Sequence, residues 1–426
     1  MRRLKAYLRV LAGNIILHPL SRLFPRDRKL WAFGAADGRF DGNSKYVFLW
    51  MSRRSWPVRL IWITRDRDLA RILKERGFPG VYRWSWEGIR AAARAGMYIV
   101  NDNTSDINFS FSGGARIFNL WHGVGLKNVR YGAHVGYGAG LRAHPRNPLA
   151  RVRNMRRFEA PDWVLATSPE MAREFFSRCF ELPVERAPAL GYPRLDPAGD
   201  EELRQLAISF DDYSMIEVDD KSMRRIIYVP TLRDNAPDLL ASALPDFERL
   251  SAALQSQNAM LFLKLHPKMK VGHDGHLALP PNIRVLSAYL DVYPVLHSFD
   301  ALITDYSSLF FDYIFARSQG VVLYTYDFDE YRASERDLAW DYDEATVGVR
   351  ANDFGTLCEV IGDGRAFAEL EPEKLRFLRQ RFWGGEPSLP LASERVAEFL
   401  LAETCPDSRP SGMPSLSPGG AGRAVP

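Results

Sequence analysis

Leu302–Tyr313 reads L-I-T-D-Y-S-S-L-F-F-D-Y, and it joins a short apolar run to a helix-like run through Ser307 and Ser308. A junction of this kind is typical of α/β proteins, in which a buried strand leads into a helix. The first backbone N–H groups of a helix have no partner inside that helix. Together with the two serine hydroxyls, they form a site that suits a phosphate group.

The same strand-then-helix order recurs along the chain, which has 426 residues and is too long for one ordinary hydrophobic core. It predicts an α/β fold with two domains, each built on a parallel sheet covered by helices. Helical patterns are seen, for example, at Asp68–Arg76, Pro169–Cys179 and Asp246–Gln255. The strand-like runs are Leu30–Gly34, Val58–Thr64, Met97–Val100, Arg116–Trp121 and Trp163–Thr167, then Ile226–Val229, Met260–Leu265, Ile283–Val285, Ala301–Thr304 and Gly320–Tyr324.

A polar stretch over 196–224 separates the two series of strands and contains an acidic run. We predict a basic N-terminal segment (1–29), a first domain (30–205), a linker (206–224), a second domain (225–403) and a disordered tail (404–426) rich in Pro, Ser and Gly. Three widely spaced cysteines form no disulfide framework, which favours a reducing cytoplasm.

Positive charge is concentrated in two segments, although the net charge is only +4. Residues 1–30 hold eight Lys or Arg and one acid, and residues 107–158 hold nine Lys or Arg and no acid. The apolar run 8–17 is interrupted by Arg9, lacks a cleavage site and is too short to span a bilayer. It is either a basic amphipathic helix on an anionic membrane or an ordinary packed first helix.

The second basic segment indicates an anionic partner, either a polyanionic acceptor or the anionic lipids that bear it. Nucleic acid is the competing polyanion, but no nucleic-acid reader motif accompanies the charge, and we expect none to bind. The candidate residues of this acceptor or membrane patch are Lys127, Arg130, Arg153, Arg156 and Arg157.

Polar residues that suit catalysis or phosphate binding follow four of the predicted strands. In open α/β sheets ligands bind beyond the carboxyl ends of the strands, so these residues are expected to face a common cleft. If the two sheet edges face each other across this cleft, the residue of the first domain lies opposite the residues of the second. The residues are His122 from the first series, and Thr231, Arg233, His266 and Asp305 from the second.

Six ordered motifs make the chain resemble the CDP-glycerol glycerophosphotransferase family, which builds polymers of the teichoic-acid type. They are W-H-G-V-G-L-K (121–127), G-Y-P-R-L-D (191–196), Y-V-P-T-L-R-D (228–234), L-K-L-H-P-K (263–268), I-T-D-Y-S-S-L-F-F-D-Y (303–313) and Y-T-Y-D-F-D-E-Y (324–331). An early G-R-F-D-G-N-S-K-Y (38–46) resembles the family's N-terminal substrate loop.

The resemblance implies a GT-B architecture, with two Rossmann-like domains around a cleft, and a transferase that needs neither metal nor cofactor. It implies a CDP-glycerol or related CDP-polyol donor and release of CMP. The acceptor would be lipid-linked or a glycan, in cell-surface polymer synthesis. It also implies peripheral attachment at the cytoplasmic face of the cell membrane.

Within that chemistry, His122 is the expected base for an acceptor hydroxyl, and the resemblance implies a catalytic or pyrophosphate-binding role for His266. Thr231, Ser307 and Ser308 offer hydroxyls to phosphate, and Arg233 offers a guanidinium. Plainer roles stay open: turn histidines, helix N-capping by the serines, and pairing of Arg233 with an acid. Asp305 either accepts from a substrate hydroxyl, orients a histidine or supports a turn.

Other polar clusters are expected to carry no chemistry. Asp327, Asp329 and Glu330 are predicted to form a solvated loop, and His273 and His276 have no further ligands close by in the sequence. Two alternatives to a CDP-polyol transferase stay open: a GT-B nucleotide-sugar glycosyltransferase, and a non-catalytic membrane- or polyanion-binding protein. Release of CMP from CDP-glycerol would support the CDP-polyol transferase, whereas release of UDP from a UDP-sugar would support the glycosyltransferase.

Overall fold

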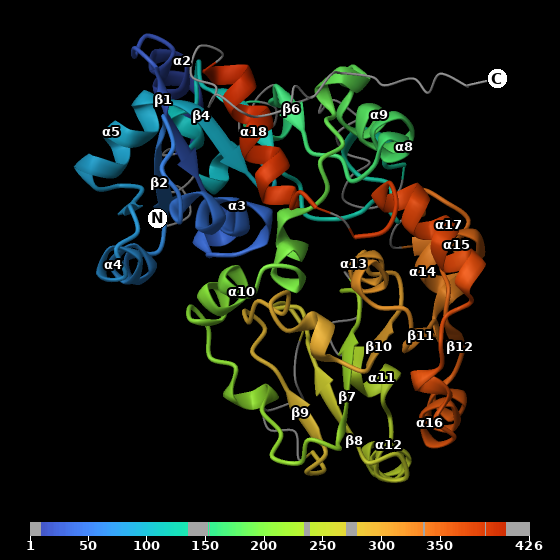
Figure 1. Cartoon of the computed structure of the whole chain (residues 1–426). Helices are drawn as coiled ribbons and strands as arrows, with labels where there is room; N and C mark the ends of the chain where they lie inside the picture. Colours follow the sequence, from blue (N-terminus) through green and yellow to red (C-terminus); the bar gives the residue numbers. More distant parts are fainter. Residues whose placement is uncertain are drawn as a thin grey trace, which may run out of the picture.

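The computed structural model describes residues 10–134, 152, 154–233, 239–269, 279–334, 337–387 and 389–405. Within these residues lie two six-stranded sheets, one above the other in Figure 1. Their orders are β3-β2-β1-β4-β5-β6 and β12-β11-β10-β7-β8-β9, and all paired strands run parallel. Each sheet therefore reverses its strand order once, next to its first strand, which is where such sheets bind ligands. The predicted α/β fold with parallel sheets is confirmed.

The first sheet contains the five predicted strands and one that was not predicted. Its strands are β1 (Asp27–Phe33), β2 (Arg59–Thr64), β3 (Gly80–Tyr82), β4 (Ala95–Val100), β5 (Arg116–Asn119) and β6 (Trp163–Val164). Strand β3 has only three residues, too few to show a period. Strand β1 begins at Asp27, three residues inside the segment expected to precede the first domain.

The second sheet repeats this pattern: five predicted strands and one short one that was missed. Its strands are β7 (Arg224–Val229), β8 (Ala259–Leu263), β9 (Ile283–Val285), β10 (Ala301–Thr304), β11 (Val321–Tyr324) and β12 (Val349–Ala351). Strands β8, β10 and β11 are buried along their whole length, as expected for parallel strands with both faces covered.

Helices cover both sheets and follow the strands in alternation (Figure 1). The α-helices are α2 (His18–Ser21), α3 (Gly42–Ser52), α4 (Arg67–Glu75), α5 (Trp86–Arg94), α7 (Met155–Phe158), α8 (Pro169–Met171), α9 (Ser177–Phe180), α10 (Glu201–Ile208), α11 (Leu239–Ala243), α12 (Phe247–Gln255), α13 (Leu309–Ala316), α14 (Phe328–Ser334), α15 (Tyr342–Ala345), α16 (Phe354–Gly362), α17 (Pro372–Trp383) and α18 (Ala392–Thr404). None of the helices in the described part of the chain has the length and hydropathy needed to cross a membrane.

The last helix, α18, returns to the first sheet. Its Phe399 ring lies 5.7 Å from the rings of both Phe118 and Trp163. The C-terminal end of the range 225–403 thus packs on the first sheet, although the domain limits themselves stay predictions. The expected disordered tail lies almost entirely outside the described residues.

A buried ion pair joins the two halves. Lys45 on α3 is fully buried, and its Nζ lies 2.9 Å from Asp291 after β9 and 3.4 Å from Asp211 in the predicted linker. The Tyr46 hydroxyl donates to the same Asp291 carboxylate at 2.7 Å. Burial alone would raise the pKa of Asp291, but the Lys45 charge and hydrogen bonds from Lys45, Tyr46 and the Tyr293 N–H more than offset it and lower that pKa. The pair is therefore ionised in the folded protein.

Replacing Lys45 with Met should lower the free energy of unfolding by about 3–5 kcal/mol, because Asp291 would be left buried without its cation. The folded pKa of Asp291 lies below its ordinary value, so the pair's contribution is present above about pH 4. It is lost as the pH falls through the folded pKa. Urea denaturation at pH 7 and at lower pH measures both effects.

Lys74→Met is the matched control, because the Lys74 pair with Glu87 is exposed on both sides (55% and 60%). It should change the free energy of unfolding by less than about 1 kcal/mol. Equal losses for Lys45→Met and Lys74→Met would contradict a special role for the buried pair.

Candidate active site

A cavity of about 1220 Å³ lies at the carboxyl ends of the strands and is lined from both halves of the protein. The first half contributes the loop Asp37–Asp41 after β1, and Asp66 and Asp68 after β2. Five residues predicted to function line it too: Lys127, Thr231, His266, Ser307 and Ser308. The loop that resembles the family's substrate loop thus faces the residues expected to bind the donor.

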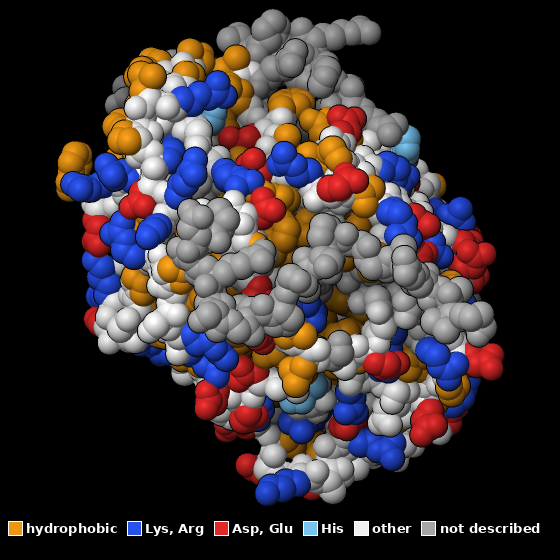
Figure 2. Space-filling model, turned by 45° about the horizontal axis from the view of Figure 1, so that its top comes forward, with side chains coloured by type: hydrophobic (Ala, Val, Ile, Leu, Met, Phe, Trp, Pro, Cys, Tyr) orange, Lys and Arg blue, Asp and Glu red, His pale blue; other side chains and the backbone are white. Residues whose placement is uncertain are grey.

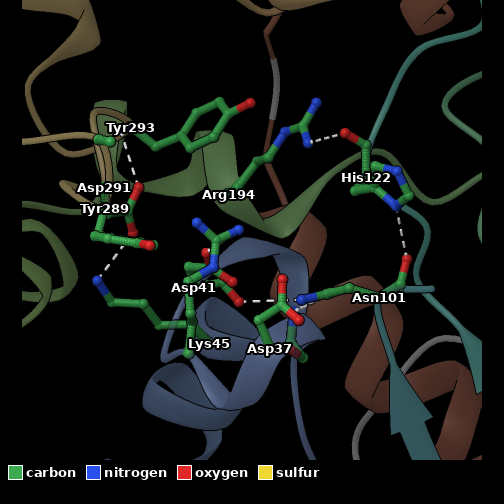
Figure 3. A network of polar contacts seen from close by, with 12 residues as sticks. Asp37, Asp41, Lys45, Asn101, His122, Arg194, Tyr289, Asp291 and Tyr293 are labelled. Carbon is green, nitrogen blue, oxygen red and sulfur yellow. Dashed lines mark hydrogen bonds and ion pairs between the residues drawn. The ribbon is translucent and has the colours of Figure 1, made fainter. Parts of the chain in front are cut away.

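His122 was expected to face the same cleft, but it is not among the residues that line this cavity. It lies at the contact between the two halves, and its side chain is exposed. Its Nδ1 lies 3.0 Å from the carbonyl oxygen of Asn101, shown in Figure 3. Because a carbonyl can only accept, Nδ1 carries the proton, and Nε2 of the neutral ring is the basic nitrogen. The next residue, Gly123, approaches α13 so closely that a Cβ there would lie 3.0 Å from the Ser308 Oγ.

The loop that carries His122 is held in an unusual conformation. Trp121 has φ 52°, in the left-handed region that side chains other than glycine rarely adopt. Asn43 donates to the carbonyls of Leu120 and Trp121, both at 3.0 Å, and Asn119 Oδ1 accepts from the Trp121 N–H at 2.9 Å. The early G-N-S-K motif thus supports the histidine loop from the buried side, a role that the sequence did not reveal.

Arg194 of the G-Y-P-R-L-D motif ties His122 to the second half. Its Nη1 donates to the His122 carbonyl at 2.6 Å (Figure 3). Its Nη2 donates to Asp312 on α13, also at 2.6 Å. The Tyr293 hydroxyl also donates to Asp312, at 3.0 Å. Burial lowers the pKa of Arg194, but Asp312 more than offsets this and raises it. Arg194 and Asp312 were quoted within motifs but given no role. Neither follows a predicted strand, because Arg194 lies in the helical segment Pro193–Ala198 and Asp312 lies within α13.

Arg233 and Asp305 are engaged with each other rather than turned toward the cavity. Arg233 Nη2 lies 2.9 Å from Asp305, and its Nε lies 2.7 Å from Asp327. Asp305 also accepts from the Thr231 N–H at 2.9 Å. The pairing of Arg233 with acids, left open above, is what the structure shows, and both acids are largely buried. The prediction of a solvated loop at 327–330 is therefore wrong for Asp327; α14 begins directly after it.

The hydroxyl groups on the donor side differ in how they are used. The Thr231 Oγ1 is buried and has no hydrogen-bond partner among the described residues. Ser307 Oγ accepts from the Leu309 N–H at 3.3 Å, whereas Ser308 is the N-cap residue of α13 without a side-chain capping bond. Plain N-capping therefore does not account for Ser308, whose hydroxyl faces Gly123 instead.

His266, after β8, has the opposite proton arrangement to His122. Its Nδ1 accepts from the Lys268 N–H at 3.2 Å, so the proton of a neutral ring is on Nε2.

Two other residues that line the cavity have shifted pKa values. Burial, and to a smaller extent the positive charge of Arg39, lowers the pKa of Lys264 to about 8. Burial raises the pKa of Asp41 to about 6 on the same cavity wall, although Arg39 opposes the shift.

The residues of the predicted acceptor or membrane patch have different surroundings in the structure. Lys127 lines the cavity, whereas Arg130 donates to the carbonyl of Arg157 at 3.1 Å and lies over the Phe180 ring. Arg156 is exposed beside Ser105. Arg153, like His273 and His276, lies outside the described residues.

A sequence model of the CDP-Glycerol:Poly(glycerophosphate) glycerophosphotransferase family matches residues 16–401. The chain belongs to this family. The teichoic acid glycerol-phosphate transferase of Staphylococcus aureus (strain NCTC 8325 / PS 47) is 25% identical over 369 residues, covering 85% of this chain and 90% of that protein. The teichoic acid ribitol-phosphate primase of Bacillus spizizenii (strain ATCC 23059 / NRRL B-14472 / W23) is 25% identical over 240 residues, covering 56% and 59%.

A solved structure of the wall teichoic acid polymerase TagF shares this fold, with a TM-score of 0.71 and 20% identity over 96% of this chain and 98% of that one. The predicted GT-B-like fold, family and class of enzyme, a CDP-glycerol-dependent transferase, are thus confirmed. The roles of individual residues stay predictions.

The link between Arg194 and Asp312 can be tested by a double-mutant cycle. Arg194→Met and Asp312→Leu should each lower the free energy of unfolding by about 3–5 kcal/mol, because each leaves one buried charge unpaired. The double variant should recover part of that loss, because both charges are then gone. Urea denaturation of the four proteins measures the coupling; strictly additive losses would contradict it.

Proposed function

We propose that this protein transfers glycerol phosphate, or a related polyol phosphate, from a CDP-polyol to a hydroxyl of a lipid-linked acceptor. The observation that carries the proposal is the placement of His122, with its basic Nε2, next to the start of α13 across the Gly123–Ser308 contact. A base and a phosphate-binding helix start are what attack of a hydroxyl on phosphorus requires. One TagF structure is of a crystal soaked with CDPG.

In the proposed reaction, His122 Nε2 takes the proton of the acceptor hydroxyl as its oxygen attacks the phosphorus that bears the polyol. The new oxygen–phosphorus bond forms as the bond from that phosphorus to the bridging oxygen breaks, and CMP leaves. The Asn101 carbonyl holds the ring in the required tautomer and stabilises the imidazolium that forms. His122 is then reset by losing its proton to solvent.

On the donor side, Thr231, Ser307 and Ser308 bind the pyrophosphate through hydroxyl and backbone N–H groups. The His266 Nε2–H donates a hydrogen bond to the departing phosphate, where negative charge develops, and keeps its proton. Arg233 and Asp305 act as positioning residues: their ion pair and the Asp305 bond to the Thr231 N–H fix the loop that carries Thr231. The curated relatives include both glycerol- and ribitol-phosphate transferases, so the donor class is a CDP-polyol.

We further propose that the enzyme acts at the cytoplasmic face of the cell membrane as a peripheral protein. Basic side chains of the first half, Arg156 and Arg157 among them, would attract anionic head groups. Large apolar side chains exposed on the same half would enter the interface: Ile15, Ile16, Leu20, Leu23, Phe24 and Trp86.

Purified protein, supplied with membranes, should release CMP from CDP-glycerol or CDP-ribitol and no UDP from UDP-sugars. His122→Ala should reduce the rate by about 10²–10⁴-fold, the usual contribution of a general base, with donor affinity little changed. Nucleotide release resolved by chromatography measures the rate, and calorimetry measures donor affinity.

His297→Ala is the control for loss of a histidine, because His297 belongs neither to the cavity nor to the Gly123–Ser308 contact; it lies in the turn Leu296–Ser298, beside α13. It should retain CMP release within about twofold. Absence of turnover with every CDP-polyol, or full activity of His122→Ala, would refute the proposed function.

Donor affinity should fall as the pH rises through about 8, because the pKa of Lys264 is lowered to about 8 and Lys264 lines the cavity, where its ammonium donates to the Ala288 carbonyl. Below that pH the charged form attracts the pyrophosphate, and above it the attraction is lost. Lys264→Met should bind CDP-glycerol more weakly at pH 7 and show a flatter profile. Calorimetric titration between pH 6.5 and 9 measures both profiles; identical profiles would rule the role out.

A further inference from the structure

A second cavity, of about 670 Å³, lies outside the active site, between the N-terminal segment and the loops after β3 and β4. Its walls are largely apolar and include Val10, Leu17, Trp84 and Phe109. Three of these side chains are also exposed at its rim: Val10 (44%), Leu17 (37%) and Trp84 (48%). Figure 2 shows hydrophobic side chains gathered at this end of the molecule, where Figure 1 places α2.

Three arginines, Arg65, Arg83 and Arg156, line the same cavity. Arg65 pairs with Asp37, but Arg83 and Arg156 form no ion pair with any carboxylate of the described residues. The Arg83 Nε is buried without a hydrogen-bond partner there. Burial, then the charges of Arg65 and Arg156, lower the pKa of Arg83. Uncompensated cations at an apolar cavity indicate an anionic ligand with an apolar part.

This cavity adjoins the active site through two short stretches of chain. Arg65 lines the apolar cavity, and its neighbour Asp66 lines the active site. Ser105 lines the apolar cavity and follows Asn101, which holds His122, by four residues. Four residues span at most about 14 Å, so a group bound at Ser105 lies near the catalytic histidine.

We infer that this cavity binds the lipid end of the acceptor: a single-chain lipid phosphate or pyrophosphate. Its apolar chain lies against Leu17, Trp84 and Phe109, and its phosphate lies between Arg83 and Arg156. The inference rests on the proposed function, because it assigns a site to the lipid of the proposed acceptor. It also gives the N-terminal segment a specific task, as a wall of this cavity.

Neither part of such a ligand suffices by itself. Inorganic phosphate would gain the two cations but leave the apolar walls in water, and a neutral alcohol would leave the Arg83 and Arg156 charges without a counter-ion. A phospholipid bilayer offers many head groups to the outside of the protein, but its lipids need not enter the cavity. We therefore expect tight binding only when the phosphate and the apolar chain belong to one molecule.

Calorimetric titration of the full chain with farnesyl phosphate, below its critical micelle concentration and without CDP-donor, tests the inference. Farnesyl phosphate should bind at least about tenfold more tightly than farnesol or inorganic phosphate. The Arg83→Gln/Arg156→Gln variant should lose about tenfold or more in affinity, because two charge-assisted contacts are removed. Arg71→Gln/Arg90→Gln, with the same change in net charge on exposed residues of α4 and α5, should bind as the wild type does.

Equal binding of farnesyl phosphate, farnesol and inorganic phosphate, or unchanged binding by the cavity variant, would overturn the inference. Binding to phosphatidylglycerol vesicles without binding to farnesyl phosphate would overturn it too, because the charge would then recognise a bilayer surface. If the double variant fails to fold, Arg156→Gln alone, an exposed side chain, repeats the test. The titration contains no CDP-polyol, so its result is separate from failure of the proposed transfer reaction.

Discussion

The Arg194 guanidinium is the contact on which the active site depends, because one planar group holds parts of both halves of the protein. It donates to the carbonyl of His122 and to the carboxylate of Asp312, both at 2.6 Å. The first contact fixes the expected base, and the second fixes the helix whose first residues line the donor side. A lysine has one ammonium and cannot reproduce this planar fork.

Buried polar groups of this kind cost desolvation energy, and their value lies in geometry rather than in stability. Two buried ion pairs connect the first half to the second. Lys45 on α3 pairs with Asp291, and Arg194 in the segment Pro193–Ala198 pairs with Asp312. An apolar contact between the halves would tolerate sliding, whereas a charged pair has one low-energy arrangement. The two pairs therefore set the register in which the two sheet edges face each other.

The sequence predicted the fold well because parallel buried strands are continuous apolar runs and their carboxyl ends are where ligands bind. Strands β3 and β12, with three residues each, were missed, although length alone is not the reason, because β9 is equally short and was predicted. The site was predicted in part. Thr231, His266, Ser307 and Ser308 were expected at the cleft and do line the cavity, although their roles stay predictions. Arg233 looked like a phosphate ligand and is instead held by Asp305 and Asp327. No local pattern distinguishes a guanidinium that binds substrate from one that a distant carboxylate has already neutralised.

The two histidines show why the tertiary structure was needed to assign chemistry. In sequence, W-H-G and L-H-P are both short turns after a strand, and either ring can donate or accept. In the fold, the Nδ1 of His122 meets a carbonyl and the Nδ1 of His266 meets an N–H, so the rings carry their protons on opposite nitrogens. A transfer from a donor to a hydroxyl is helped by one group that takes a proton and by a hydrogen-bond donor that stabilises the charge of the leaving phosphate. In the proposed reaction, the backbone partners of the two rings, rather than the histidines themselves, would assign these two roles.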